Sequence, residues 1–227
     1  MLIRPAEASD AGAIADVQLR SRAAAPMPPG VHTDDEVRTW LAGRLETDEV
    51  WVAEDGDAVV GYARLTADWL DDLYVVPEHA GQGIGSALLD VAKTQRPGGF
   101  CLWVFESNEP ARAFYARHGL VELERTDGSA NEERAPDVRM AWPGTHPLAF
   151  LRGLIDEVDE QLGDLLARRA ALTAAVQAHK DDRSRDLERE RQIAEALAVR
   201  APALGPDRLA RIVHAIITES LDAAGSG

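Results

Sequence analysis

Apolar residues follow two different patterns along this chain of 227 residues. Up to about residue 145, short runs of β-branched and aromatic residues alternate with stretches at helical spacing, such as Asp10 to Arg22 and Ser86 to Thr94. From about Phe150 onward, Leu, Ile and Val recur at helical spacing without strand-like runs. The first part is therefore predicted to mix strands with helices, and the second to be all-helical. The predicted strands are Leu2 to Arg4, Val50 to Ala53, Val59 to Leu65, Leu73 to Val76 and Phe100 to Phe105.

The two patterns meet in a segment that suits neither of them. From Ala141 to Pro147 the sequence reads AWPGTHP, and its prolines and glycine interrupt both strands and helices. A chain of this length with 45% apolar residues can bury two modest cores. We therefore expect two domains, over residues 1–145 and residues 146–227.

The net charge of −15 argues against nucleic acid or an anionic membrane surface as the main partner, because both need clustered Lys and Arg. The acidic excess lies mainly in residues 1–145, which hold 25 acidic and 13 basic residues. Such an excess either attracts cationic small molecules to the protein or serves only to keep the protein soluble.

The chain has one cysteine, Cys101, so it can form no internal disulfide, and no Cys/His cluster has the spacing of a metal site. The first residues lack the apolar core of a signal peptide, and no run of about 18 apolar residues occurs. A cytoplasmic location is expected.

A glycine-rich turn joins a predicted strand to a predicted helix. Gly81, Gly83 and Gly85 let the backbone approach a ligand closely, and the following helix points its free N–H groups at the turn. A pyrophosphate is the natural ligand. By itself, the pattern equally fits a turn that needs glycine only for its geometry, and the dinucleotide-binding fold uses a similar device.

Residues 71–89, which contain this turn, resemble the signature of the GNAT N-acetyltransferases, in which a splayed strand precedes a Gln/Arg-x-x-Gly-x-Gly/Ala pyrophosphate loop. Further on, residues 107–120 (SNEPARAFYARHGL) resemble the late helix of that family. Two motifs in the family's order argue against chance similarity. The resemblance covers roughly residues 1–142. It implies an α+β mixed sheet with flanking helices and acetyl-CoA as cosubstrate.

The resemblance also implies roles for single residues. Tyr115 would protonate the departing CoA thiolate, although a simple core position is the alternative for this side chain. A carboxylate would take the proton of the attacking amine, with Asp71, Asp72 and Glu106 as candidates. Ala80 departs from the Arg or Gln usual at the start of the loop, which should weaken CoA binding somewhat. The expected CoA-binding residues are Val75, Val76, Gly81, Gln82, Gly83 and Gly85, through their backbone, and Asn108.

In the second part, seam residues alternate at spacings of four and three along one predicted helix of at least 26 residues, about 39 Å long. Arg169 occupies a position of this seam, and Lys180 follows on nearly the same side. Buried cations imply buried anions. Further helices are expected from Asp186 and from about Asp207, the latter with Ser220 on its apolar side. The seam comprises Leu151, Ile155, Val158, Leu162, Leu165, Arg169, Leu172 and Val176.

As a pattern alone, the seam fits a coiled-coil dimerisation module whose cations pair with its many acids. The residues nevertheless resemble the all-helical, AroQ-type chorismate mutases over about residues 148–224, through the segments LRGLIDEVD (151–159), LLARR (165–169), DLERE (186–190) and IITES (216–220). The resemblance implies a three-helix domain that forms an intertwined homodimer. It would rearrange the dianion chorismate to prephenate without cofactor, nucleophile or acid–base pair.

Catalysis of this rearrangement requires positive charge around a compact substrate conformation. By resemblance, three Arg would clamp the two carboxylates, the first of them reaching into the partner subunit's site. The Lys would donate to the ether oxygen, the Glu would accept from the ring hydroxyl, and the Ser would contact a carboxylate. These residues are Arg152, Arg169, Lys180, Arg189, Glu190 and Ser220.

One departure separates two functional hypotheses. Ala224 stands where the mutases have a Gln or Glu that shares the ether oxygen with the Lys. The intact cationic set favours a bifunctional enzyme, in which a mutase of aromatic amino-acid biosynthesis (the shikimate pathway) is joined to an N-acetyltransferase with an unknown amine acceptor. Ala224 favours the alternative, an acetyltransferase whose degenerate mutase-like domain serves as a dimerising or ligand-sensing module.

Overall fold

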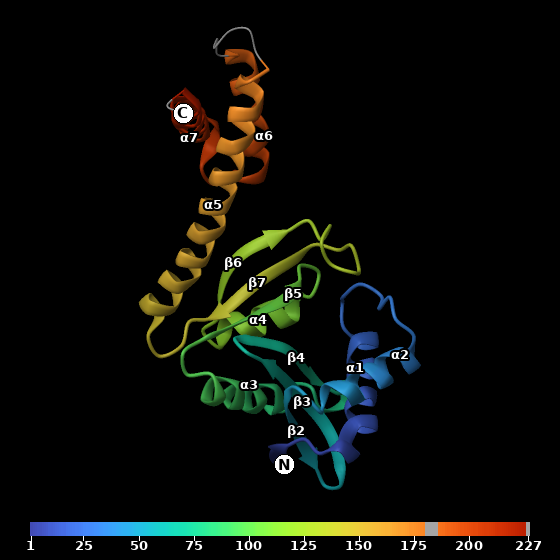
Figure 1. Ribbon diagram of the computed structural model, residues 1–227. Coiled ribbons are helices and arrows are strands. Elements are labelled where there is room, and N and C mark those ends of the chain that lie inside the picture. The colour runs from blue at the N-terminus through green and yellow to red at the C-terminus, as the bar shows by residue number, and fades with distance from the viewer. Residues whose placement is uncertain (180–185, 226–227) are drawn as a thin grey trace. The chain divides into compact units, whose positions relative to one another are not determined.

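The computed structural model describes residues 1–179 and 186–225, and the chain divides into two compact units, Met1–Arg152 and Gly153–Gly227 (Figure 1). The division falls inside helix α5 (Pro147–Gln177), just beyond the segment where the sequence patterns change. The predicted class of fold, a mixed sheet with flanking helices followed by an all-helical part, is confirmed. The domain limits at residues 145 and 146 stay a prediction.

Within the described residues, the first unit carries a seven-stranded sheet in the order β1-β2-β3-β4-β5-β7-β6. Neighbouring strands pair antiparallel except β4 and β5, which run parallel because helix α3 carries the chain back between them. The five predicted strands are present, whereas β6 and β7 were not predicted. The strands are β1 (Leu2–Pro5), β2 (Glu49–Asp55), β3 (Ala58–Thr66), β4 (Trp69–Val75), β5 (Phe100–Phe105), β6 (Val121–Thr126) and β7 (Asp137–Trp142).

Helices cover both faces of this sheet. Successive residues of a strand point to opposite faces. A Cβ on Gly61 of β3 would lie 3.2 Å from both Ile84 and Leu88, whereas the next residue, Tyr62, donates its hydroxyl to Gln18 at 2.9 Å. Helix α3 therefore packs on one face and α1 on the other (Figure 1). The helices are α1 (Ala11–Ala24), α2 (Asp34–Arg44), α3 (Ile84–Gln95) and α4 (Glu109–Arg117), with 3-10 turns at Ala8–Asp10 and Pro77–His79.

Strands β4 and β5 diverge after their first residues. Trp69 and Cys101 form the register pair that joins them, although the strands continue to Val75 and Phe105. The carboxyl ends of the two strands therefore separate and leave a gap in the middle of the sheet. In sheets with parallel strands, such carboxyl ends are where ligands bind.

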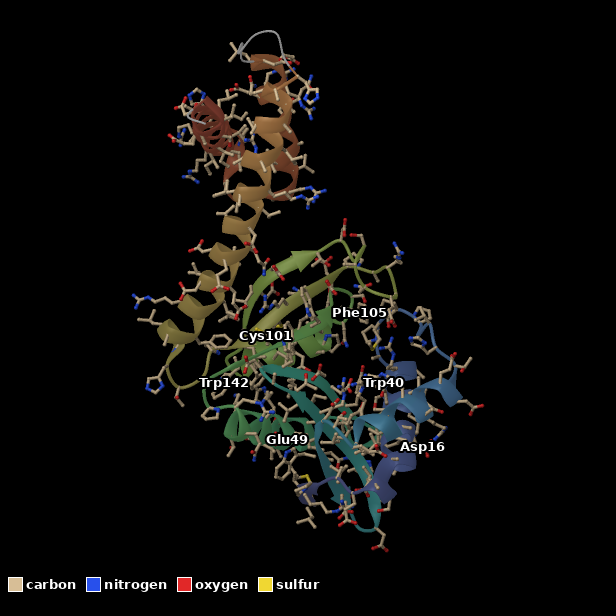
Figure 2. The ribbon with its side chains drawn as sticks, viewed as in Figure 1. Asp16, Trp40, Glu49, Cys101, Phe105 and Trp142 are labelled. Carbon is tan, nitrogen blue, oxygen red and sulfur yellow. The ribbon has the colours of Figure 1, made fainter. Side chains whose placement is uncertain are left out.

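The first turns of α5 pack on the first unit. The ring of Phe150 lies against Gly99, where an added Cβ would meet the ring at 2.5 Å. Just before the helix, the N–H of Thr145 donates to the carbonyl of Pro97 at 3.0 Å. Trp142, labelled in Figure 2, packs on Phe100 with 5.6 Å between the ring centres. The segment with the two prolines is therefore held against the turn that precedes β5.

The second unit contains the rest of α5 together with α6 (Leu187–Arg200) and α7 (Gly205–Gly225). The predicted long helix is confirmed at 31 residues, and Asp186 caps α6 by accepting the N–H of Arg189 at 2.9 Å. Helix α7 begins at Gly205, slightly earlier than expected. Among the described residues of this unit, the buried ones are Ala194, Leu209, Val213 and Ser220.

The apolar seam of α5 remains largely uncovered within one chain. Among the described seam residues, Ile155, Val158, Leu165 and Leu172 are each about 60% exposed. Helices α6 and α7 pack mainly on each other. Apolar side chains in such a row are normally covered by another element.

Candidate functional site

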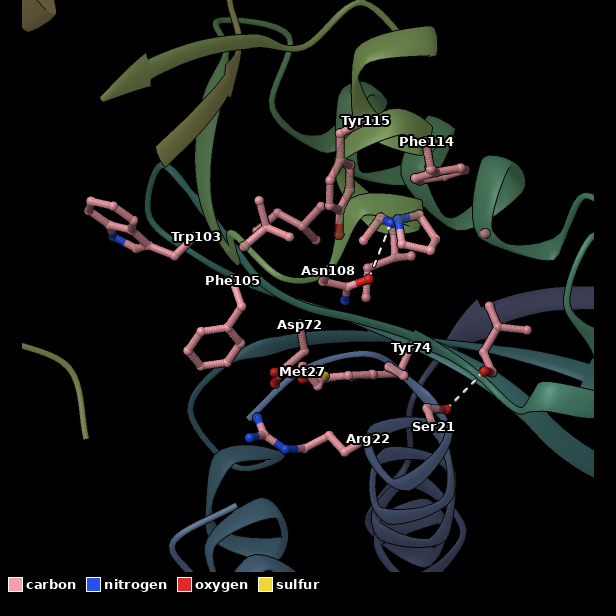
Figure 3. Close-up of a pocket in the computed structure, with 18 of the residues that line it drawn as sticks. Ser21, Arg22, Met27, Asp72, Tyr74, Trp103, Phe105, Asn108, Phe114 and Tyr115 are labelled. Atoms are coloured by element: carbon pink, nitrogen blue, oxygen red, sulfur yellow. Dashed lines mark hydrogen bonds between the residues drawn. The ribbon is translucent and has the colours of Figure 1, made fainter. Parts of the chain in front are cut away.

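A cleft of about 1050 Å³ occupies the gap between β4 and β5 (Figure 3). One wall is β4, from Leu70 to Val75, and the opposite wall is formed by the end of β5 and by α4. The glycine-rich turn lies at one end of the cleft. Residues from the end of α1 and from the β6–β7 connection (127–136) line the other end.

The glycine-rich turn forms an open donor site at the start of α3. Gly81 and Gly83 have φ values of +76° and +86°, a conformation that favours glycine. The first intrahelical bond runs from the N–H of Ala87 to the carbonyl of Gly83, at 3.0 Å. The preceding N–H groups, including that of Gly85, therefore point out of the helix toward the turn. The Gln82 side chain donates to the Glu78 carbonyl at 3.0 Å. The group of Gln82 that can serve a ligand at the turn is therefore its backbone N–H.

The backbone of β4 offers a further donor. The N–H of Val76 donates to the carbonyl of Val60 at 2.9 Å, and its own carbonyl accepts from His79 at 3.0 Å. In an antiparallel pair these directions alternate, so the N–H and carbonyl of Val75 point away from β3 and toward the gap. Ser21 of α1 donates to the Val75 carbonyl at 2.8 Å. Of the two valines, Val75 thus has the N–H that faces the cleft.

Tyr115 and Asn108 lie on the wall opposite β4 (Figure 3). Tyr115 is 8% exposed, and its hydroxyl points into the cleft. Burial raises the pKa of this phenol above its usual value, so the group stays protonated at neutral pH. Asn108 caps α4 through its Oδ1, which accepts the N–H of Ala111 at 3.3 Å, and its amide nitrogen points into the cleft.

The three candidate bases lie in different surroundings. Asp72 is buried in the β4 wall, where Arg64 donates to it at 2.6 Å, and burial raises the pKa of its carboxyl. Asp71 is exposed at the cleft and accepts from Thr66 at 2.7 Å. Glu106 forms an ion pair with Arg125 instead.

The end of the cleft away from the glycine turn is acidic. Four carboxylates line the cleft, while its arginines are Arg22 at this end and Arg117 on α4. Arg22 pairs with Glu133 at 2.9 Å, which ties α1 to the β6–β7 connection. The sequence did not indicate Ser21, Arg22 or Glu133 as site residues. The lining carboxylates are Asp71, Asp72, Glu133 and Asp137.

In the second unit, the structure brings Arg169 and Ser220 together. The guanidinium of Arg169 on α5 donates to Ser220 Oγ on α7 at 2.9 Å, and Ser220 is 7% exposed. Arg169 and Ser220 are 51 positions apart in the sequence. Their contact between α5 and α7 agrees with the prediction that both lie on the apolar faces of their helices. The same nitrogen also donates to the carbonyl of Ile216 at 3.5 Å, and the guanidinium keeps further N–H groups to bind a carboxylate.

The other described residues expected at the mutase site lie on α5, α6 and α7. Arg152 is exposed near the start of α5, and Arg189 is exposed in the first turn of α6. Glu190 is half-buried, with one carboxylate oxygen 3.9 Å from the ring of His214. Lys180 falls outside the described residues. Ala224 is half-buried near the end of α7.

A mixed sheet that splays between two parallel strands beside a glycine-rich helix start defines a GNAT-type fold. Residues 46–122 match the acetyltransferase (GNAT) domain family. The peptidyl-lysine N-acetyltransferase YjaB of Salmonella typhimurium is 34% identical over 109 residues, which cover 48% of this chain and 74% of that protein. The chain belongs to the GNAT acetyltransferases.

Further relatives agree with this assignment. The peptidyl-lysine N-acetyltransferase YiaC of Escherichia coli is 27% identical over 146 residues, covering 63% of this chain and 97% of that protein. The solution structure of apo YjaB from Escherichia coli shares the fold, with a TM-score of 0.53 and 24% identity over 63% of this chain and 98% of that one. A GNAT structure from Rhodopseudomonas palustris gives a TM-score of 0.54 at 22% identity, over 63% of this chain and 94% of that one.

The second unit has its own family. Residues 151–224 match chorismate mutase type II. The chain thus combines an N-acetyltransferase domain, of a family that uses acetyl-CoA, with a chorismate mutase domain. Across the residues that the structure describes, no helix has the length and apolar character needed to cross a membrane.

The glycine turn generates a first testable prediction. Gly83→Asp should weaken acetyl-CoA binding by about 10–10²-fold, because it places a negative charge next to the pyrophosphate at this exposed turn. Gly83→Asn is the matched control, because it adds a side chain of the same size without charge and tolerates a positive φ. Isothermal titration calorimetry measures both affinities. Wild-type affinity in Gly83→Asp would refute the assignment of the loop.

Proposed function

We propose that the chain is a bifunctional enzyme. Its first domain transfers the acetyl group of acetyl-CoA to a primary amine, and its second rearranges chorismate to prephenate. The observation that carries the first activity is the cleft between β4 and β5, which has an open N–H site at one end and Tyr115 on its wall. The family matches over residues 46–122 and 151–224 support both activities.

Acetyl-CoA fits the cleft from the glycine turn inward. The N–H groups of Gly81, Gln82, Gly83 and Gly85 would hold the pyrophosphate at the positive end of α3. The pantetheine arm would run along β4 and accept the N–H of Val75, as a missing strand neighbour would. Val76 would contribute less, because its N–H is bonded to β3. Asn108 would donate its amide to the same arm.

The transfer step uses Tyr115 as the general acid. The amine nitrogen attacks the acetyl carbonyl, the C–S bond breaks, and the phenol gives its proton to the leaving thiolate. Of the candidate bases, Asp72 fits best, because it lines the cleft and its raised pKa makes it a stronger proton acceptor than an ordinary carboxylate. The proton lost by the amine would reach it directly or through water.

The acidic end of the cleft supports a cationic acceptor. Its carboxylates outnumber its arginine, so they would attract an ammonium group and place it near the acetyl carbonyl. Trp103 and Phe105 line the same part of the cleft and would flank an aliphatic stem. YjaB and YiaC are named as peptidyl-lysine N-acetyltransferases. We take a lysine side chain as the acceptor.

Substitution of the proposed acid tests the transferase mechanism. Tyr115→Phe should lower kcat by about 10²–10³-fold, because the thiolate then leaves unprotonated. The KM for acetyl-CoA and the calorimetric affinity for CoA should stay unchanged, since the ring is kept. A release assay for the CoA thiol measures kcat. Unchanged kcat would assign Tyr115 to the core alone.

The mutase site would form between the helices of the second unit. Arg169, held by Ser220, and Arg189 would bind the carboxylates of chorismate, while Lys180 would donate to the ether oxygen. Glu190 would accept from the ring hydroxyl. No cofactor is needed, because the ether C–O bond breaks and a C–C bond forms within one molecule.

A homodimer would complete this site. The exposed seam of α5 is the kind of surface that a second copy covers, and Arg152 would then reach the partner's site. The alternative remains a dimerising or ligand-sensing module, which the half-buried Ala224 favours because it supplies no donor to the ether oxygen. A cytoplasmic location belongs to the same proposal.

Restoring the missing donor distinguishes an active mutase from a dimerising or ligand-sensing module in the second domain. Ala224→Gln should raise turnover of chorismate by about 10²–10³-fold, the usual effect of one donor to an oxygen that gains charge. The exposed neighbour offers a matched control, Ala223→Gln, which should change nothing. Depletion of chorismate is followed by absorbance. Complete inactivity of wild type and Ala224→Gln, with retained binding of a transition-state analogue, would favour the sensing module.

The dimer is tested on the full chain. Light scattering should give twice the mass of one chain. Leu165→Glu should give the monomer, because two charges would face each other in the seam. Ala167→Glu, on the other side of the helix, should leave the dimer intact. A well-folded wild-type monomer would contradict the proposal.

A further inference from the structure

A histidine and a serine meet beside the glycine turn. Ser86 lies in the first turn of α3, three residues after Gly83, and His118 follows the end of α4. The distance from His118 Nε2 to Ser86 Oγ is 2.9 Å, and both residues line the cleft. Both residues lie within the two acetyltransferase motifs, but neither was expected as a site residue.

The histidine ring is held in one orientation. Its Nδ1 lies 2.8 Å from the carbonyl oxygen of Phe114, and a carbonyl can only accept, so Nδ1 carries a proton. The ring packs on Phe114 with 4.3 Å between ring centres. Lys93 of α3 donates to the carbonyl of His118 at 2.7 Å, which fixes the backbone as well. The Nε2 atom is therefore the one position at which the ring can change its protonation state.

The protonation state of Nε2 decides what the Ser86 hydroxyl can do. When Nε2 is unprotonated, it accepts the hydroxyl hydrogen, and Ser86 presents only lone pairs to the cleft. When Nε2 is protonated, it donates to Ser86 Oγ, and the hydroxyl hydrogen is released to bond to an anion. Phosphate oxygens accept hydrogen bonds, so they are repelled by the first arrangement and bound by the second.

The titratable and charged groups near the ring come from α3, from α4 and from the 3-10 turn before the glycines, where His79 also lines the cleft. On α3, Lys93 is bonded to the carbonyl of His118, and Asp90 lies one turn beyond Ser86 at the exposed surface. On α4, Arg117 precedes the histidine and lines the cleft. An arriving pyrophosphate adds two negative charges to this set and so favours the protonated ring.

We propose that His118 is a positioning residue for the pyrophosphate of CoA. Binding draws one proton from solvent onto Nε2, and the Ser86 hydroxyl turns to donate to a pyrophosphate oxygen. The proposal rests on the binding of acetyl-CoA in this cleft. Affinity for the ligand should therefore fall as pH rises, because the proton that binding requires is taken up from a solution with a lower proton concentration.

Calorimetry with dephospho-CoA tests this coupling, because that ligand keeps the pyrophosphate but lacks the separately titrating 3′-phosphate. Titrations at pH 7.5 in HEPES and in Tris, whose ionisation enthalpies differ, give the number of protons taken up. Wild type should take up a measurable fraction of one proton. His118→Gln should take up fewer protons than wild type, because an amide donates to Ser86 at every pH, and its affinity should vary less than that of wild type from pH 6.5 to 8.5.

Ser86→Ala supplies the second variant. It should weaken binding about tenfold near pH 6.5, the usual effect of one hydrogen bond to a charged group. Adding His118→Gln to Ser86→Ala should cost little more, because the histidine acts through the serine. Equal proton uptake in wild type and His118→Gln, or additive losses in the double variant, would overturn the proposal. Failure of wild type to bind dephospho-CoA or CoA at all would instead refute the proposed transferase site.

Discussion

The separation of β4 from β5 is the constraint on which the first domain depends. A central strand that loses its neighbour leaves backbone groups unpaired, and each buried unpaired group costs about 1–3 kcal/mol. In this chain the opening is confined to the carboxyl ends, because Trp69 and Cys101 still pair at the start. Ser21 donates to the carbonyl of Val75, whereas the N–H of Val75 faces the cleft. A ligand that lies along β4 therefore takes the place of a strand and completes the sheet.

Charged side chains are compensated differently in the two units. Beneath the cleft, Arg64 is shared between Asp72 at 2.6 Å and Asp48 at 2.8 Å, so a cation and two anions compensate each other's desolvation in part. Between the helices of the second unit, Arg169 is held by the neutral Ser220. The first arrangement leaves negative charge for an ammonium group, and the second leaves positive charge for a carboxylate. The two domains thus suit substrates of opposite sign.

The elements that have a clear period or motif could be predicted from the sequence. The strands with apolar runs, the long helix and the cap at Asp186 follow from local pattern and agree with the structure. Strand β6 and helix α2 were missed because about half of their residues are charged, and tertiary contacts hold them in place. Arg22 and Glu133 are 111 residues apart, so folding alone brings them to one end of the cleft. No local signal could have joined them.

The start of α5 belongs physically to the transferase, although it opens the mutase helix. The ring of Phe150 covers Gly99, which has a φ of +116° and no room for a Cβ beneath the ring. Excision of the transferase at the apparent linker would therefore remove a piece of its own wall. The cut would leave Phe150 with the mutase and uncover Gly99 in the transferase. A cut placed after Phe150 would keep that contact but would shorten the first helix of the mutase at its amino end.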